Sequence, residues 1–242
     1  MENFIFGLRP IYEALKANKN IDKVLVKSNL TGEFASEIFK EIKKKGIQIQ
    51  HVPVEKLNKL CKSNHQGAIA YLSPINYFLL AEIIEEIVQN KEKPLFVILD
   101  GITDVRNFGA IARTAECAGV DAIIIPKENS VRISEDAIKT SAGALFNIKV
   151  CRESNLVDAI MILQQFGVNV YAVTEKANLD IYSFDFNKPA AFVLGSEENG
   201  ISNSVLKRCD DKIKIPMFGK TESLNVSVST SIVLYETIRQ RL

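Results

Sequence analysis

Three polar segments in the second half of the chain contain side chains that can hold a ligand and move a proton. NFGAIARTA carries Asn107 and Arg113, LGSEENG carries Glu197, and MFGKTESLNVSVSTS carries Ser223 and Asn225. Proteins use amide, hydroxyl, carboxylate and guanidinium groups to orient a substrate and to accept its proton. The last two segments follow apolar runs that read as strands, and an open α/β sheet binds its ligands at the carboxyl ends of its strands. We therefore expect a binding site here.

Each segment alone also has a purely structural interpretation. Asn107 suits the N-cap of a helix predicted over 107–118, and Arg113 suits a solvent-facing position on that helix. Glu197 and Glu198 suit a hydrated loop, while the hydroxyls at the start of the last helix suit capping. The sequence lacks the glycine fingerprint G-x-G-x-x-G and the phosphate loop GxxxxGK(S/T), which argues against a nucleotide-dependent oxidoreductase.

These segments belong to a stretch in which apolar β-branched runs alternate with helical patterns. Strands are predicted at FVILD, DAIIIP, NIKVC, VNVYAVT, AFVLG and IKIP, and helices over 107–118, 134–141 and 156–166 and from Asn225 onward. Such alternation indicates an α/β fold with a mostly parallel sheet.

A smaller α/β unit precedes this stretch. Helices are predicted over 9–18, 33–45 and 54–62, and strands at DKVLVK, IQIQHV and GAIAYL. A charged helix over 79–93 then leads to the strand that follows Pro94. We therefore expect a first domain at 1–75, a linker at 76–93 and a second domain at 94–242.

Composition is that of an ordinary globular protein, with 242 residues of which 47% are hydrophobic. No apolar run approaches the roughly 20 residues that span a bilayer, and the N-terminus lacks a secretory signal pattern, so we expect a cytoplasmic protein without a membrane partner. The four cysteines are far apart and the two histidines complete no ligand spacing. We therefore expect neither a metal site nor disulfides.

The net charge of +1 conceals an uneven distribution. Residues 1–75 carry 12 Lys and Arg against 7 Asp and Glu, whereas the remainder carries 18 against 22. A basic first domain is compatible with binding to nucleic-acid phosphates, although a scatter of surface lysines explains the same count.

In this order and at this spacing, NFGAIARTA, LGSEENGIS and IPMFGKTESLNVSVSTSIVLYE closely resemble the three motifs of the SpoU (TrmH) family of RNA ribose 2′-O-methyltransferases, in the SPOUT superfamily. The stretch from FGLRPIYEAL to HQGAIAYLSP is similar to the substrate-binding domain of the branch that methylates guanosine in 23S rRNA. The resemblance implies a C-terminal trefoil knot, a small N-terminal α/β domain of the ribosomal protein L30e type that binds RNA, and a homodimer.

The resemblance also implies a cofactor and site residues. The methyl donor is S-adenosylmethionine, and the matching positions of its pocket are Leu194, Gly195, Ile215, Met217 and Leu224. The family's catalytic set matches Asn107, Arg113, Glu197, Ser223 and Asn225, all present without substitution.

The base is the open point of this assignment. The family's proposed base is Arg113, yet a guanidinium stays protonated to a pH above about 12. We expect Arg113 to hold a phosphate or stabilise the developing alkoxide, while Glu197 or a water accepts the proton or Glu197 orients Asn107. The intact set argues against a non-catalytic RNA-binding protein, and the long first domain favours rRNA over tRNA as the substrate.

Overall fold

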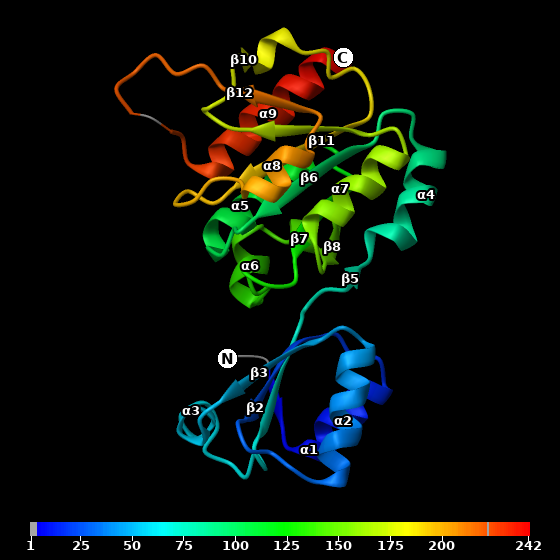
Figure 1. Ribbon diagram of the computed structural model, residues 1–242, viewed down its shortest axis with the longest axis vertical. Coiled ribbons are helices and arrows are strands. Elements are labelled where there is room, and N and C mark those ends of the chain that lie inside the picture. Colours follow the sequence, from blue (N-terminus) through cyan, green and yellow to red (C-terminus); the bar gives the residue numbers. More distant parts are fainter. Residues whose placement is uncertain (1–3, 222) are drawn as a thin grey trace. The chain divides into compact units, whose positions relative to one another are not determined.

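The structure is a computed structural model that describes residues 4–221 and 223–242. It divides into two compact units, of which one runs to Asn76 and includes Ile133–Glu135, while the other comprises Tyr77–Arg132 and Asp136–Leu242 (Figure 1). Within the described ranges, no helix combines the length and the apolar character needed to cross a membrane.

The first unit is a four-stranded sheet with helices on both faces. Strands β1 (Phe4–Phe6), β2 (Ile21–Lys27), β3 (Gln48–Val52) and β4 (Ala68–Leu72) lie in the order β1-β4-β2-β3. β4 is antiparallel to β1 and β2, whereas β2 and β3 are parallel. Helices α1 (Leu8–Lys16) and α2 (Glu33–Lys44) cover one face, and α3 (Val54–Leu60) lies on the other (Figure 1).

The alternation of side chains along β2 explains why both faces are covered. Val24 and Val26 pack with residues of α1 and α2, while Leu25 packs in a second cluster with Leu57 of α3. Successive side chains of a strand point to opposite faces, so a fully apolar strand needs a helix on each side.

The second unit is built on an eight-stranded sheet in the order β10-β12-β9-β11-β6-β7-β8-β5. Its strands are β5 (Tyr77–Phe78), β6 (Leu95–Asp100), β7 (Ala122–Pro126), β8 (Lys149–Glu153), β9 (Asn169–Val173), β10 (Leu179–Asp180), β11 (Ala190–Gly195) and β12 (Asp211–Lys214). Each strand pairing described in this sheet is parallel. The prediction of a mostly parallel α/β sheet is confirmed.

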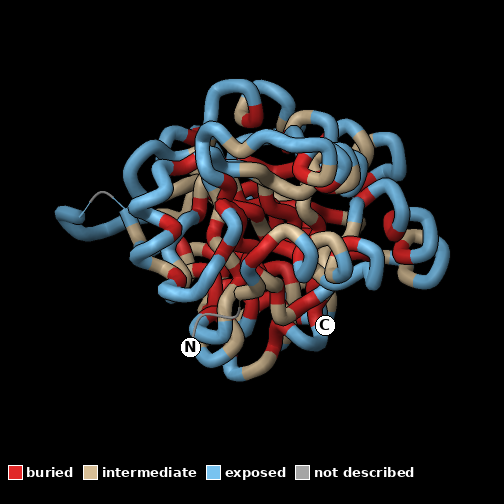
Figure 2. The backbone as a smooth tube through the Cα atoms, turned by 90° about the horizontal axis from the view of Figure 1, so that it is seen from below, coloured by how far each residue is buried: buried red, intermediate tan, exposed pale blue. Residues whose placement is uncertain are grey.

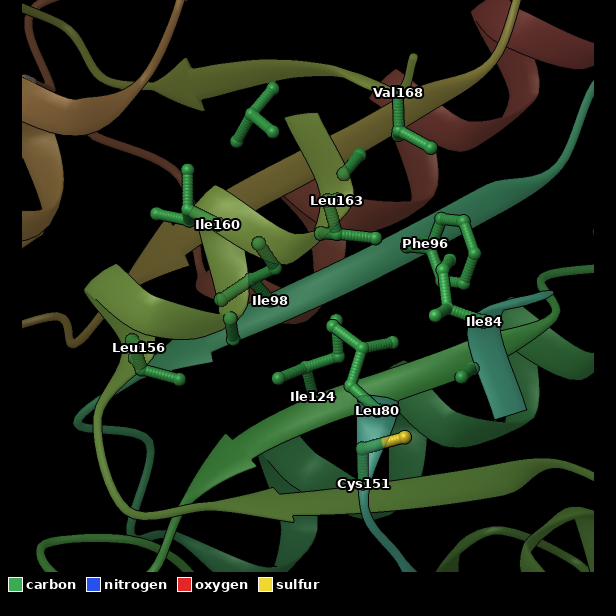
Figure 3. Close-up of a cluster of buried hydrophobic side chains, with 14 of the residues drawn as sticks. Leu80, Ile84, Phe96, Ile98, Ile124, Cys151, Leu156, Ile160, Leu163 and Val168 are labelled. Carbon is green, nitrogen blue, oxygen red and sulfur yellow. The ribbon is translucent and has the colours of Figure 1, made fainter. Parts of the chain in front are cut away.

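Helices cover both faces of this sheet. α4 (Leu80–Asn90), α7 (Leu156–Gln165) and α8 (Asn203–Arg208) share one core cluster with Phe96, Ile98 and Ile124 of the sheet (Figure 3). On the opposite face, α5 (Val105–Cys117) lies against α9 (Val226–Arg241), and their hydroxyls at Thr114 and Ser231 are 3.2 Å apart. α6 (Glu135–Thr140) precedes β8. Figure 2 shows buried residues in the interior of the tube and exposed residues along its outer turns.

The stretch 76–93 differs from the linker that the sequence led us to expect. It forms β5, which pairs with β8, and α4, which belongs to the second unit. Leu80, Ile84 and Ile87 are buried against the sheet. An amphipathic helix with such an apolar face is held by its packing, so a linker assignment based on its charged residues was wrong.

The end of α9 is held by the segment that follows β10. The side chain of Gln240 accepts from the backbone N–H of Phe186 at 2.7 Å and donates to the carbonyl of Phe184 at 3.0 Å. Arg241 donates to the carbonyls of Phe186 and Lys188 at 3.1 and 2.7 Å. Burial lowers the pKa of the Arg241 guanidinium, and these carbonyls replace the water that it loses.

Gly109 permits the close approach of α5 to the end of α6. A Cβ atom on Gly109 would lie 2.6 Å from Cβ and 2.8 Å from Cγ2 of Thr140. We expect Gly109→Ala to destabilise the protein by about 1 to 3 kcal/mol, because overpacking exceeds the gain in helix propensity. Urea unfolding followed by circular dichroism measures this change. Adding Thr140→Ser should recover part of the loss, and a Gly109→Ala variant of raised stability would contradict the packing seen here.

Candidate active site

Loops gather at the carboxyl ends of three adjacent strands of the second unit. β9, β11 and β6 are neighbours, and Gly195 at the end of β11 pairs with Asp100 at the end of β6. β6 leads into α5, and β11 leads into the loop before α8. The order of these parallel strands therefore brings together loops that are far apart in the sequence.

Three of the predicted catalytic residues form a hydrogen-bonded cluster there. The amide nitrogen of Asn225 donates to Oδ1 of Asn107 at 3.0 Å and to Oε1 of Glu197 at 2.6 Å. Asn107 donates to the same Oε1 at 3.1 Å. Within the described residues, Oε2 of Glu197 has no hydrogen-bond partner, so it can accept a proton or a further hydrogen bond.

The helix caps explain why both asparagine amides are available to the cluster. Asp104, and not Asn107, is the N-cap of α5, and its carboxylate accepts from the backbone N–H of Asn107 at 2.7 Å. The prediction of Asn107 as an N-cap was wrong, because an acidic capping residue three positions earlier takes that role. Asn225 caps α9 with its oxygen, which accepts from the N–H of Ser227 at 2.9 Å. Its amide nitrogen remains free for Asn107 and Glu197.

The five predicted cofactor residues line one cavity of about 290 Å³. Its lining contains both apolar and polar side chains, and its charged residues are three glutamates and one lysine. The lining residues are Val173, Thr174, Glu175, Lys176, Leu194, Gly195, Ser196, Glu197, Glu198, Asn199, Gly200, Ile201, Ile215, Met217, Ser223, Leu224, Val226 and Ser229. We refer to this space as the first cavity. Its excess of carboxylates favours a ligand that carries positive charge.

A second cavity, of about 500 Å³, lies on the α5 side of the loop after β11. It is lined by Asp100, Gly101, Ile102, Thr103, Asp104, Asn107, Asn129, Ser196, Glu197, Glu198, Asn199, Gly200, Ser202 and Val226. Residues 196–200 line both cavities. This loop is therefore a common wall, and Glu197 is accessible from both sides.

The common wall is a tight turn folded over the end of β11. The N–H of Gly200 donates to the carbonyl of Ser196 at 2.9 Å, and the N–H of Ser202 donates to Asp100 at 2.7 Å. A Cβ atom on Gly195 would lie 2.0 Å from the carbonyl carbon of Gly200 and 2.2 Å from the nitrogen of Ile201. Only glycine fits at the strand end, because the returning loop occupies the space of a side chain.

The other two predicted catalytic residues lie differently. Ser223 lines the first cavity. Arg113 is exposed on α5 and lines neither cavity. It is six positions after Asn107, which corresponds to about 9 Å along the helix and a different side of it. The structure does not bring Arg113 to the cluster of its own chain.

Sequence reasoning missed the contribution of β9 to the site. Val173, Thr174 and Glu175 follow or end β9 and line the first cavity. Thr174 and Glu175 are polar residues at the end of a predicted strand, which was an available signal, but they belong to none of the three motifs. The position of β9 beside β11 brings them to the site. Asp100 of the second cavity carried a signal, since it ends a predicted strand, and Asp104 follows it in the turn before α5.

Cys151 and Cys209 are poor candidates for nucleophiles or metal ligands. Burial raises the pKa of the Cys151 and Cys209 thiols to about 12, so thiolates are scarce near neutral pH. Among the described residues, no group of three or more His, Cys, Asp and Glu side chains is placed to hold a metal ion.

Comparisons with known proteins agree with the motifs. A model of the SpoU rRNA Methylase family matches residues 94–235, and a model for RNA 2′-O ribose methyltransferase substrate binding matches residues 4–78. YacO of Bacillus subtilis, named as a TrmH family tRNA/rRNA methyltransferase, is 34% identical over 239 residues, which cover 99% of this chain and 96% of YacO.

Solved structures share the fold. The SpoU methyltransferase AviRb from Streptomyces viridochromogenes has a TM-score of 0.64 and 23% identity, covering 99% of this chain and 90% of AviRb. An rRNA methyltransferase from Sinorhizobium meliloti, solved with AdoMet bound, has a TM-score of 0.63 and 24% identity, covering 100% of this chain and 88% of the other. The family model spans more than half of the chain and YacO nearly all of it, which confirms the resemblance of the three motifs: the chain belongs to the SpoU (TrmH) family of RNA methyltransferases.

Proposed function

We propose that the protein transfers a methyl group from S-adenosylmethionine to a ribose 2′-hydroxyl of RNA, with a guanosine of 23S rRNA as the preferred target. The observation that carries this proposal is the position of Glu197, which is held by Asn107 and Asn225 in a wall common to two cavities. A transfer reaction needs its two reactants next to each other and within reach of the catalytic group, and Glu197 lines both cavities.

The first cavity suits the donor. When bound, S-adenosylmethionine supplies an electrophilic methyl group on a positively charged sulfur. Leu194, Ile215 and Leu224 offer an apolar surface to its adenine, and the carboxylates of Glu175 and Glu198 balance its positive charges. The AdoMet bound to the fold relative from Sinorhizobium meliloti supports the same ligand class.

The second cavity suits the ribose of the target nucleotide. There the 2′-hydroxyl can approach Oε2 of Glu197, which would accept its proton as the oxygen bonds to the methyl carbon. The S–CH3 bond would break in the same step, and the sulfur would keep its electron pair and leave as the neutral thioether. Asn107 and Asn225 fix the carboxylate by donating to Oε1. Ser223, on the wall of the first cavity, contributes a hydroxyl on the donor side.

Arg113 acts from a second copy of the chain in this proposal. It lies exposed on α5, next to α9, whose apolar side chains Val228 and Tyr235 are 45% and 53% exposed and seven positions apart. Spacing of seven places both on one side of a helix. We propose that this α5–α9 surface forms the homodimer, and that the partner's guanidinium then reaches the phosphate of a bound nucleotide.

Two further structural proposals accompany this function. The C-terminal trefoil knot expected for the family is proposed on the match of residues 94–235 to the SpoU model. The first unit is proposed to be an RNA-binding domain of the L30e type, which its basic charge and its match to the substrate-binding model support.

The substrate RNA is the first expected outcome to measure. Mass-spectrometric mapping of 2′-O-methyl groups in rRNA and tRNA should show one guanosine of 23S rRNA that loses its methyl group when the gene is deleted. A copy of the gene should restore it, and a Glu197→Gln copy should not. A lost tRNA modification would select the tRNA alternative, to which the name of YacO also points. If neither RNA loses a modification, the remaining hypothesis is that the protein binds RNA without catalysing methyl transfer.

Binding of the methyl donor should require a glycine at position 195, where there is no room for a Cβ atom. We expect Gly195→Ala to abolish S-adenosylmethionine binding in isothermal titration calorimetry, because the added carbon displaces the wall at Gly200 and Ile201. Gly219→Ala is the matched control, since a Cβ there meets nothing within 4 Å. Equal donor affinity in both variants would remove the first cavity from consideration as the donor site.

Substitutions of Glu197 and Arg113 should change different kinetic parameters. Glu197→Gln keeps the shape but not the basicity, so we expect kcat to fall about 100- to 10 000-fold with donor affinity retained. Arg113→Ala should mainly raise the KM for RNA and weaken its salt dependence.

Mixed dimers test whether Arg113 acts in the partner's site. Dimers that pair one Arg113→Ala subunit with one Glu197→Gln subunit, purified with two different tags, retain one site with both groups intact if Arg113 acts across the interface. At RNA concentrations well below the raised KM of the Arg113→Ala dimer, we expect them to be more active than either parent dimer. Mixed dimers no more active than the Arg113→Ala dimer would place Arg113 in the site of its own chain.

A further inference from the structure

The loop between β12 and α9 holds an aromatic side chain in open water. Phe218 is 98% exposed, directly after Met217, which lines the first cavity. Gly219, Lys220 and Thr221 follow and are also exposed. Residues 218–221 stand away from the body of the second unit, in the orange part of the ribbon in Figure 1. An unburied phenyl ring therefore sits at the edge of the proposed donor site.

The degree of exposure distinguishes Phe218 from the other apolar surface residues. Among the described residues, exposed Phe146, Tyr182 and Tyr235 keep between 53% and 65% of their surface in water, and only Leu242 at the chain end equals Phe218. Single exposed apolar residues are common and need no explanation. Full exposure of a large ring at the rim of a cavity is a different case. A ligand that covers the ring removes its whole apolar surface from water, and this burial favours binding.

The residues around the Phe218 ring favour a nucleobase as the group that stacks on it. Met217 and Phe218 are followed by glycine, lysine and threonine, so the loop offers one flat ring beside a cation and no continuous apolar patch for a protein interface. A single ring and a single cation are sufficient for RNA, because bases stack on aromatic faces and lysines contact phosphates. Phe218 is also absent from the lining of the first cavity, which separates it from donor binding.

We propose that Phe218 stacks on an unpaired base next to the methylated nucleotide, while Lys220 contacts the adjoining phosphate. This inference rests on the proposed function, since it assumes that RNA approaches the two cavities. Phe218 is then a positioning residue: it holds the strand so that the target ribose meets Glu197. RNA recognition favours such splayed, single-stranded nucleotides.

The absence of tryptophan from the chain makes the stacking directly observable. Phe218→Trp introduces a single tryptophan, whose fluorescence should be quenched by a short single-stranded RNA of mixed sequence. An abasic RNA of the same length carries the same phosphates without bases and should not quench it. Phe146→Trp is the matched control, because it places a tryptophan at a 65% exposed phenylalanine that lines neither cavity.

Affinity measurements separate stacking from general apolar contact. We expect Phe218→Ala to weaken RNA binding about 5- to 100-fold and to raise the KM for RNA, with S-adenosylmethionine affinity unchanged. Phe218→Leu keeps apolar bulk but has no π-face, so it should resemble alanine. Phe218→Tyr should restore binding.

Three results would overturn the proposal. Full activity of Phe218→Leu would indicate apolar contact rather than stacking. A fluorescence change of Phe218→Trp with protein concentration alone would assign the ring to a contact between two copies, and a change with S-adenosylmethionine alone would assign it to donor binding. Because the wild-type protein is assayed for methyl transfer in parallel, an inactive wild type is recognised as failure of the proposed function and not of this inference.

Discussion

The contact between Gly195 and the backbone of Gly200 and Ile201 is the constraint on which the rest of the site depends. It lets the chain turn back over the end of β11 instead of continuing away from the sheet. The returned loop separates two cavities and carries Glu197 into reach of Asn107 and Asn225. Had the strand ended in any residue with a side chain, the carboxylate and its two amide donors would belong to unconnected loops.

Local signals in the sequence predicted most of the fold. Apolar β-branched runs gave the long strands of the second unit, and apolar periodicity gave its main helices. Strands of two or three residues, such as Phe4–Phe6 and Leu179–Asp180, carry too few positions for a period and were missed. The cap of α5 was misassigned because Asp104 and Asn107 are both good capping residues, and only geometry decides between them.

The site was predictable as a set of residues but not as an arrangement. The motifs pointed to the segments that hold the cluster, because polar residues after buried strands are unusual. The role of β9 depends on which strand lies beside β11, and no local pattern encodes that neighbour. The exposed position of Arg113 depends likewise on how α5 packs on α9. The prediction of the site therefore failed where it depended on which distant segments pack together, and not in the choice of residues.

The cluster also has a consequence for biosynthesis. Asn107 and Asn225 are 118 positions apart, and their hydrogen bond joins the first helix after β6 to the helix that begins at Val226. During translation, the first unit and much of the parallel sheet emerge before α9 exists. Contacts between such distant segments form late in folding. A nascent chain on the ribosome therefore lacks an assembled Glu197 site, and the protein becomes competent for chemistry only after α9 has left the ribosome that made it.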